Sequence, residues 1–387
     1  MHAPPLKTTT LRGGPPRIAL AHDWLVGYRG GEAVLHHIVN ALRSARADGE
    51  LGPIFTLFDN GEPLSGAIDD VPRRASVLGR LPFAATTLRR WLLPLYPAGV
   101  RDLSRQLARE HAQRPIDLLV STSSAGVKNL APPPGVPHLC YCHTPPRYVW
   151  SQARQYGGGL RGLGLGLFGP ALRAWDRESS GVTRFLANST HTAGEIRRCY
   201  GRDADVLFPP VRTGFFTPDA SIPRGDHWLV VGALEPYKRF DLAIAAANAL
   251  GHPLTVVGGG SEQARLRSMA GPTVTFAGRV DDERLRREYR TARCLLFPQV
   301  EDFGIVAVEA LACGTPVVAR AAGGALDTVD DETGSLFSES SVDALTAAIR
   351  SCPAPGPVVA AACRASAERF STAAFEAGFL HAVEAIG

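Results

Sequence analysis

Two acidic residues flank a short loop and the start of an apolar helix in the C-terminal half of the sequence. Glu301 lies in the loop, Gly304 follows it, and Glu309 lies eight residues after Glu301 on the helix predicted over 305–312. Glycine lets the backbone approach a ligand closely, and the first N–H groups of a helix, which lack intrahelical partners, suit a phosphate. From about one and a half turns into the helix, the Glu309 carboxylate can accept hydrogen bonds from a ribose diol. The alternative is two surface acids beside a helix start.

A basic turn precedes another predicted helix of the same half. A buried strand is predicted to end at Gly232, and Lys238 and Arg239 stand just before the helix predicted over 240–250. Open α/β sheets bind ligands at the carboxyl ends of their strands, and two cations there suit a diphosphate. The arginine offers a two-pronged donor and the lysine a point charge. A solvated basic turn explains these residues about as well.

Two segments of the N-terminal half also carry candidate residues. Gly30 and Gly31 open a helix shortly after the first predicted strand, where they are candidates for backing a phosphate or an acceptor. The pair belongs to neither a G-x-G-x-x-G nor a G-K-[ST] phosphate motif. His143 stands at the end of the strand predicted over 137–142, where it can hydrogen-bond a sugar hydroxyl or a polarised carbonyl. The alternative for His143 is a histidine at the edge of the core.

The elements that must position these residues form two alternating series. Short apolar runs alternate with helical patterns, as in parallel sheets covered by helices. The predicted strands of the first series are 17–22, 53–58, 117–122, 137–142, 184–188 and 204–208. Those of the second series are 228–233, 254–257, 274–277, 294–297 and 316–319. The segment 209–224, rich in proline and without periodicity, is predicted to connect the series, and the glycine-rich segment 157–169 is predicted to be a loop.

We therefore expect an α/β protein with two Rossmann-like domains. The predicted organisation is a disordered tail over 1–16, a first Rossmann-like domain over 17–210 and a second over 211–357. A C-terminal helix over 358–387 is expected to pack back on the first domain.

Composition limits the classes of function. The chain has 387 residues with 45% hydrophobic and 20% charged residues, as in a globular protein. A net charge of +4 is too small for a dedicated nucleic-acid binder, but it suits anionic small molecules or an anionic membrane surface. Seven cysteines without a C-x-x-C pair predict reduced thiols and a cytosolic protein. Asp203 and Asp205 have D-x-D form but no ligand cluster around them, so a surface turn is predicted and no metal is expected.

Taken in order along the chain, these motifs resemble those of glycosyltransferase family 4 (GT4), retaining enzymes with the GT-B fold. The resemblance is carried by E-x7-E at Glu301, by the Lys238 turn and by VGGGSE, FAGRV and ACGTPVVA, which begin at residues 257, 276 and 312. The segments AHDWLVGYRGGE, CYCHTPPRYVW and VVGALEPYKRFDLAI are most similar to bacterial mannosyltransferases of O-antigen and exopolysaccharide assembly.

The resemblance implies two domains facing a cleft, the first (17–210) an acceptor domain and the second (211–357) a nucleotide-sugar donor domain. It also implies a metal-independent, retaining transfer of a hexose from a nucleotide sugar to a lipid-linked saccharide. The donor implied is GDP-mannose, with UDP-glucose or another UDP-hexose as the alternative. The implied donor contacts are Lys238 and Arg239 to the diphosphate, Glu309 to the ribose, Gly278, Arg279 and Val280 around the base, and Glu301, Gly304, Ile305 and Val306 to the sugar. His143 would lie beside the reacting sugar, and Gly30 and Gly31 would border the phosphates. Many relatives carry an arginine where this chain has Ala233, and Arg239 is the candidate to compensate.

A basic and apolar stretch over 73–109 has two explanations. It has no acidic residue between Arg73 and Arg101, and leucines and aromatic residues alternate with its arginines. Such a stretch can lie on an anionic membrane, here the inner face of the cell membrane, or form a basic helix packed on the first sheet.

Three other functions remain as alternatives. A nucleotide-sugar epimerase would consume donor without acceptor, and a non-catalytic sensor would bind donor without turnover. A nicotinamide dehydrogenase is disfavoured, because Gln263 stands where its third glycine should be.

Overall fold

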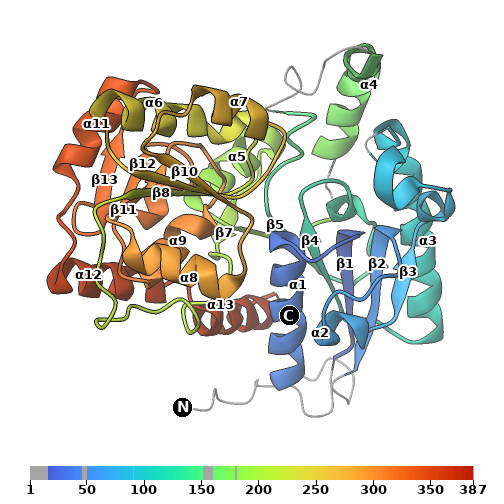
Figure 1. Cartoon of the computed structure of the whole chain (residues 1–387). Coiled ribbons are helices and arrows are strands. Elements are labelled where there is room, and N and C mark those ends of the chain that lie inside the picture. The colour runs from blue at the N-terminus through green and yellow to red at the C-terminus, as the bar shows by residue number, and fades with distance from the viewer. Residues whose placement is uncertain (1–15, 46–49, 90, 151–159, 179–180, 387) are drawn as a thin grey trace. The chain divides into compact units, whose positions relative to one another are not determined.

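The computed structural model of the chain describes residues 16–45, 50–89, 91–150, 160–178 and 181–386 (Figure 1). The chain divides into two compact units, and each contains one parallel sheet. Unit 1 comprises Met1–Phe208 together with Phe375–Gly387, and unit 2 comprises Pro209–Ala374. Apart from Pro16, the tail predicted to be disordered lies outside the described residues. The predicted α/β class and the two Rossmann-like sheets are confirmed.

Unit 1 contains a seven-stranded sheet in the order β3-β2-β1-β4-β5-β6-β7. The strands are β1 Ile18–Leu25, β2 Leu51–Asp59, β3 Arg73–Ala75, β4 Leu118–Ser123, β5 His138–Cys142, β6 Arg184–Ala187 and β7 Ala204–Val206. Neighbouring strands are parallel throughout, and the order reverses between β1 and β4. In open α/β sheets such a reversal is where ligands bind, outside the carboxyl ends of the strands.

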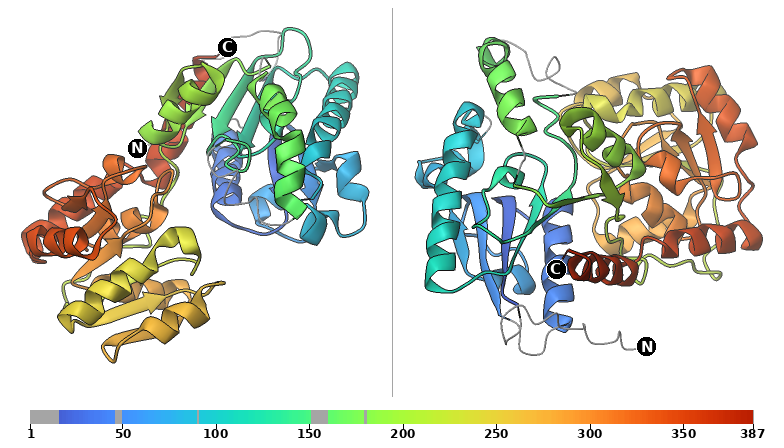
Figure 2. Two further views of the ribbon diagram at one scale, coloured as in Figure 1. Left: turned by 90° about the horizontal axis from the view of Figure 1, so that it is seen from above. Right: turned by 180° about the vertical axis from the view of Figure 1, so that it is seen from behind.

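Helices cover both faces of the sheet of unit 1 (Figure 2). The helices of unit 1 are α1 Gly30–Ser44, α2 Gly66–Asp69, α3 Tyr96–Gln113, α4 Leu160–Arg177 and α5 Thr190–Tyr200, together with α13 Thr372–Glu384 from its fourth residue onward. Of these, α4 projects beyond the ends of the strands (Figure 1). Alternate residues of β1 face opposite sides, so Leu20 packs in the core beneath α1 and α13, whereas Ala21 packs in the core beneath α3. Phe375 of α13 meets the ring of Tyr141 edge-on, with centroids 5.7 Å apart. The last helix of the chain therefore completes the core of unit 1.

The predicted C-terminal helix is two helices that belong to different units. The first, α12 (Pro357–Glu368), lies in unit 2 and packs against α9 (Ile305–Ala312). Only the residues from Phe375 onward group with unit 1. The boundary that we expected at residue 210 falls between Phe208 and Pro209 in the structure.

The prediction of a loop over the glycine-rich segment is wrong from Leu160 onward, where α4 begins. Glycines disfavour helices, but burial of one face of a helix can override that preference. The end of α4 buries Asp176, whose carboxylate accepts from Lys128 Nζ at 2.6 Å, from Trp150 Nε1 at 2.6 Å and from Tyr200 Oη at 3.0 Å. These contacts hold the helix in place.

Unit 2 contains a six-stranded parallel sheet in the order β10-β9-β8-β11-β12-β13. The strands are β8 Trp228–Val231, β9 Leu254–Val257, β10 Val274–Gly278, β11 Cys294–Phe297, β12 Val317–Arg320 and β13 Gly334–Phe337. The helices besides α9 and α12 are α6 Phe240–Leu250, α7 Gln263–Met269, α8 Asp282–Thr291, α10 Ala325–Thr328 and α11 Val342–Ser351. Helices α6 and α11 cover one face, and α8, α9 and α12 lie on the other (Figure 1). The order reverses between β8 and β11.

Within the described residues, none of the helices combines the length and the apolarity that crossing a bilayer requires. The seven cysteines are all buried and free.

Candidate functional site

The reversal of strand order in unit 2 brings together two motifs that lie far apart in the sequence. Lys238 ends a 3-10 turn, Pro236–Lys238, that follows β8, and Glu301 lies in the loop that follows β11. The Lys238 side chain is largely but not fully buried, and its ammonium contacts Oε1 of Glu301. A lysine held beside a carboxylate, rather than extended into water, is positioned to bind the more highly charged oxygens of a diphosphate.

The loop after β11 is shaped to expose the start of α9. Gly304 has φ of 96°, a left-handed value that favours glycine, and a Cβ atom there would lie 2.7 Å from the ring of Phe297. The backbone N–H of Gly324 donates to the carbonyl of Glu301 at 2.9 Å and holds the loop from the side of β12. Ile305 and Val306 form the first turn of α9, whose N–H groups have no intrahelical acceptors. Glu301 and this helix start therefore border one polar edge of the sheet.

Glu309 is held by a residue that the sequence did not single out. The hydroxyl of Tyr289, on α8, donates to Oε2 of Glu309 at 2.9 Å. Burial raises the pKa of Glu309 to about 7, whereas the hydrogen bond from Tyr289 favours the ionised carboxylate and opposes that shift. Tyr289 is fully buried. A tyrosine in an otherwise strongly charged helix was the sequence signal that could have indicated this contact.

The two neighbouring cations of the basic turn point to different partners. Arg239 has φ of 54°, and its guanidinium donates to Asp241 at 3.2 Å and to Ser340 Oγ at 2.7 Å, while Lys238 contacts Glu301. The structure thus does not bring Arg239 to Glu301.

Arg279 lies beside the glycine-rich loop that follows β9. Its Nε is 3.3 Å from the position that a Cβ atom would take on Gly259. The carbonyl of Gly259 in turn accepts from the N–H of Leu234, the residue after Ala233, at 3.2 Å. Arg279 is exposed, so its guanidinium can reach a ligand at this edge.

The residues predicted to frame a base lie at the end of β10. Gly278 has φ of 70°, its carbonyl accepts from the N–H of Gly258 at 2.7 Å, and Val280 follows two residues later. The Gly258–Gly278 hydrogen bond joins the loops after β9 and β10. The predicted base-binding loop and the glycine-rich loop are therefore neighbours.

In unit 1 the predicted residues gather around two histidines. A Cβ atom on Gly31 would lie 3.3 Å from Cε1 of His22 and 3.8 Å from Nε2 of His143, and the exposed Gly30 opens α1 beside it. Nε2 of His143 is buried and has no hydrogen-bond partner among the described residues. Burial, assisted by the nearby His22, lowers the pKa of His143 to about 3, so its ring is neutral at pH 7. A neutral ring nitrogen there can accept or donate one hydrogen bond to a ligand hydroxyl.

His22 and Glu32 form a polar bridge beneath Gly31. His22 Nδ1 contacts Thr122 Oγ1 of β4, and His22 Nε2 lies 3.8 Å from Oε1 of Glu32 on α1. Burial opposes ionisation of Glu32, but the contact with His22 lowers its pKa. Both residues lie in segments that the sequence marked, but their pairing could not be inferred from spacing.

Asp23 holds the loop after β4. Its buried carboxylate accepts from the backbone N–H groups of Ser124, Ala125, Gly126 and Val127 at 2.6–3.0 Å. These donors satisfy the hydrogen-bonding capacity of the buried carboxylate. Asp23 therefore shapes the carboxyl edge of the sheet and is not available to a ligand.

The D-x-D residues are engaged by arginines on the surface. Asp203 pairs with Arg197, and Asp205 accepts from Arg184 at 2.7 Å. Among the residues that the structure describes, no three or more histidine, cysteine or acidic side chains form a group suited to a metal ion.

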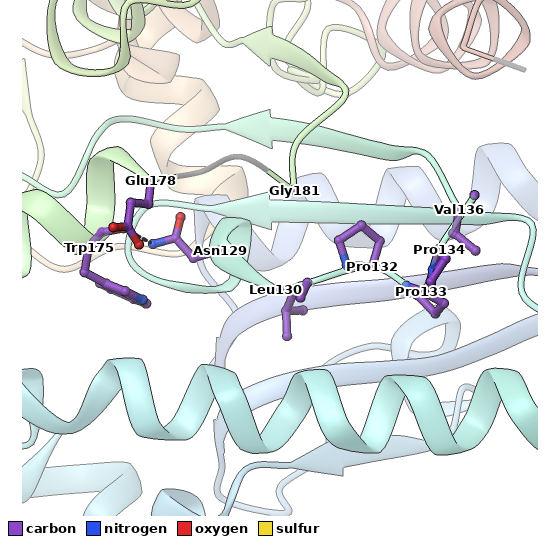
Figure 3. A pocket seen from close by; sticks show the side chains of 11 residues that line it. Asn129, Leu130, Pro132, Pro133, Pro134, Val136, Trp175, Glu178 and Gly181 are labelled. Carbon is purple, nitrogen blue, oxygen red and sulfur yellow. Dashed lines mark hydrogen bonds between the residues drawn. The ribbon is translucent and has the colours of Figure 1, made fainter.

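A separate pocket of about 430 Å³ opens elsewhere in unit 1 (Figure 3). It is lined by residues 129–136 together with Trp175, Glu178 and Gly181. This segment connects β4 to β5. None of the predicted site residues lines it.

Two family models match the chain in adjoining regions. The model described as Glycosyltransferase Family 4 matches residues 28–214, and the model described as Glycosyl transferases group 1 matches residues 223–353. The first match lies almost wholly in unit 1, and the second lies within unit 2.

Curated relatives include D-inositol 3-phosphate glycosyltransferases. The protein from Mycobacteroides abscessus is 34% identical over 194 residues, which cover 43% of this chain and 44% of the relative. The protein from Acidothermus cellulolyticus is 37% identical over 186 residues, which cover 40% of this chain and 42% of the relative. The chain thus spans less than half the length of these relatives.

Solved structures with the same fold cover nearly the whole chain. The sucrose-phosphate synthase from Thermosynechococcus elongatus has a TM-score of 0.72 and 20% identity, and it covers 95% of this chain and 98% of its own. The Anabaena protein Alr3699/HepE in complex with UDP has a TM-score of 0.67 and 16% identity, and it covers 96% of this chain and 100% of its own. The two family models support a glycosyltransferase of the group 1 and family 4 type, and the structural neighbours show the fold, which is GT-B.

Proposed function

We propose that the chain is a retaining, metal-independent hexosyltransferase that moves a hexose from a nucleotide sugar to a hydroxyl of a lipid-linked saccharide. The observation that carries the proposal is the edge of unit 2, where Lys238, Glu301, the start of α9 and Glu309 come together. This edge offers a cation, free N–H groups and carboxylates. These groups match the diphosphate, the sugar hydroxyls and the ribose diol of a nucleotide sugar.

In the proposed reaction, the diphosphate takes the place of Glu301 as the partner of Lys238. Glu301 then accepts hydrogen bonds from the donor sugar, and the N–H groups of Ile305 and Val306 face the developing negative charge. Preorganised donors of this kind stabilise a departing anion without a metal ion. The bond from the anomeric carbon to the diphosphate breaks, the acceptor oxygen bonds on the same face, and its proton passes to the diphosphate.

His143, Gly30 and Gly31 take part in the same proposal. The unpartnered Nε2 of His143 would bind a hydroxyl of the reacting sugar, and the exposed start of α1 at Gly30 would border a phosphate. Because the pKa of His143 is about 3, this ring acts as a neutral hydrogen-bonding group in the proposal and carries no charge.

GDP-mannose is the proposed donor, on the basis of the motif likeness to bacterial mannosyltransferases. A UDP-hexose is the second candidate, because structural neighbours are recorded with UDP and with UDP-glucose. The relatives named for D-inositol 3-phosphate supply an alternative acceptor, a phosphorylated polyol, to the lipid-linked saccharide. With a lipid-linked acceptor, the protein would work at the inner face of the cell membrane.

The test is release of nucleotide by the full chain from GDP-mannose or UDP-glucose, in EDTA, with a bacterial lipid extract or D-inositol 3-phosphate as acceptor. We expect release with GDP-mannose that depends on the lipid extract and retains the anomeric configuration. Release from UDP-glucose alone would replace the donor, and release with D-inositol 3-phosphate alone would replace the acceptor. Conversion of donor without any acceptor, or no turnover with any pair, would contradict the transferase proposal.

A further inference from the structure

The segment between β3 and α3 exposes an unusual number of apolar side chains. It consists of a 3-10 turn, Val77–Arg80, a π turn, Ala84–Leu88, and a second 3-10 turn, Leu93–Leu95. Its exposed apolar residues are Val77, Leu81, Phe83, Leu88, Trp91 and Leu95. Together with the exposed arginines Arg80, Arg101 and Arg105 they form what we call the docking surface. A large apolar patch exposed on a protein surface commonly marks an interaction site.

Phe83 is the most exposed residue of this apolar group. Its side chain is 75% exposed, and its backbone has φ of 57°, a left-handed value that a bulky residue rarely adopts. Elsewhere among the described residues, only Arg239 combines a positive φ with a side chain. Exposure of the Phe83 ring to water does nothing visible to stabilise the fold. The strained backbone at this residue therefore indicates a role in binding rather than in folding.

The charge on the docking surface is positive and uncompensated. Within the described part of the chain, no acidic side chain pairs with Arg80, Arg101 or Arg105. The nearest acid in sequence, Asp102, is engaged, because it accepts from the N–H of Val77 at 2.8 Å and from Gln106 at 2.9 Å. Arg101 and Arg105 are one helical turn apart on α3, so their side chains are neighbours.

Two other arginines of the stretch do not belong to the docking surface. Arg73 pairs with Asp59 and Asp69, and the Arg89 guanidinium lies over the ring of Trp24 at 4.8 Å. The structure therefore selects part of the basic stretch that the sequence marked.

The turns of the docking surface lie at the carboxyl edge of the sheet in unit 1, and Arg101 and Arg105 follow along α3. Its turns follow the end of β3, and α3 returns the chain to the start of β4, so the first turn of α3 lies at that edge (Figure 1). Gly31 and His143 follow the ends of β1 and β5 at the same edge. A ligand held by the docking surface would therefore be presented on the side of unit 1 where the candidate site lies.

We propose that the docking surface binds the headgroup and outer acyl region of an anionic bilayer, with Phe83 inserted and Arg80, Arg101 and Arg105 on lipid phosphates. Aliphatic and aromatic side chains bordered by arginines suit such an interface. A second copy of the chain fits less well, because a symmetric contact would place the arginines against each other. This proposal rests on the proposed function in one respect only, namely that the acceptor is lipid-linked.

The test is co-sedimentation of the full chain with phosphatidylcholine vesicles containing none or 30% phosphatidylglycerol. Each charge near an anionic surface changes partitioning by about five-fold, so Arg80→Glu/Arg101→Glu should lose at least ten-fold. Phe83→Asn should lose several-fold while retaining the fold, because asparagine tolerates left-handed backbone. Val358→Asn, at the exposed apolar Val358 of unit 2, is the matched control and should bind as the unmodified chain.

Three results would overturn the proposal. The first is equal partitioning onto neutral and anionic vesicles, and the second is unchanged partitioning of the two variants. The third is a dimer that forms without vesicles and that Phe83→Asn abolishes, which would assign the surface to a second copy of the chain. Nucleotide release with a water-soluble acceptor should be the same for the unmodified chain and both variants. Failure of docking is thus distinguishable from failure of the transferase proposal.

Discussion

The two units share a parallel sheet with one reversal of strand order, but they use buried charge differently. In unit 1, the charges near the carboxyl edge are enclosed and internally satisfied: Asp176 by Lys128, and Asp23 by four backbone N–H groups. In unit 2, Lys238 and Glu301 retain some exposure, and Arg279 is exposed. The buried charges of unit 1 fix loops, whereas the charges beside the candidate site of unit 2 are accessible to a ligand.

This difference assigns separate tasks to two similar sheets. A nucleotide sugar carries its charge on the diphosphate. It should therefore be recognised mainly by unit 2, whose candidate site contains accessible cations. Unit 1 offers a neutral histidine and a helix start, which suit hydroxyl groups. Substitutions of comparable chemistry in the two units should therefore affect different measurements.

The largest effect is expected from Lys128→Met in unit 1. The substitution leaves the Asp176 carboxylate buried without its cation, which should lower the free energy of unfolding by about 3–5 kcal/mol. Chemical denaturation measures the change. The control is Arg184→Met, which removes a more exposed ion pair with Asp205 and should cost about 1 kcal/mol or less. Equal losses for the two variants would mean that Asp176 is not held as the structure shows.

The next effect concerns ligand affinity in unit 2. Lys238→Met should weaken nucleotide-sugar binding about 100-fold, because a hydrogen-bonded charge on a diphosphate contributes about 1.5–3 kcal/mol. The free energy of unfolding should change little, since the ion pair with Glu301 is partly exposed. Isothermal titration and denaturation separate the two quantities. A variant that loses stability but keeps its affinity would reverse the assignment of tasks.

A smaller effect is expected from the hydrogen bond between Tyr289 and Glu309. The ionised carboxylate is the better acceptor for a ribose diol, so affinity for the donor should rise as pH increases through about 7, the pKa of Glu309. Tyr289→Phe removes a hydrogen bond that favours the ionised form, and the rise in affinity should then move to higher pH. Titration of the donor between pH 5.5 and 9 measures the midpoint. A midpoint that moves to lower pH, or that does not move, would contradict the proposed role of Tyr289.

The smallest effects compare two arginines of unit 2. Arg279→Ala should weaken donor binding about five-fold, because Arg279 is exposed beside the glycine-rich loop that follows β9. Arg239→Ala should weaken it less than two-fold, because Arg239 is bound to Asp241 and Ser340. Titration of both variants with the same donor decides between them. A larger loss for Arg239→Ala would restore the expectation that Arg239 compensates for Ala233.

Much of the fold could be predicted from the sequence, because strand and helix periodicity depend on local pattern. The two series of strands, the position of Gly304 before α9 and the loops that carry Lys238 and Glu301 are examples. The helical pattern over 170–180 was predicted, but the extension of α4 back to Leu160 could not be, because the helix is held by contacts of Asp176 with Lys128, Trp150 and Tyr200.

The candidate site was predictable in its residues but not in its pairings. Spacing places Glu309 on a helix, but the contact with Tyr289 depends on how α8 packs against α9. Likewise, Lys238 and Arg239 are neighbours in sequence, yet a left-handed backbone at Arg239 separates their partners. Side-chain direction is set by tertiary packing, and local pattern alone does not determine it.

The central claim is that unit 2 binds a nucleotide sugar through Lys238. The most direct test is the melting temperature of the chain and of Lys238→Met with GDP-mannose, GDP, UDP-glucose and UDP, all in EDTA. A ligand that binds only the folded state raises the melting temperature by mass action. The account predicts a shift with GDP-mannose and GDP that is lost in Lys238→Met. A shift of equal size in Lys238→Met, or none with any nucleotide, would contradict it.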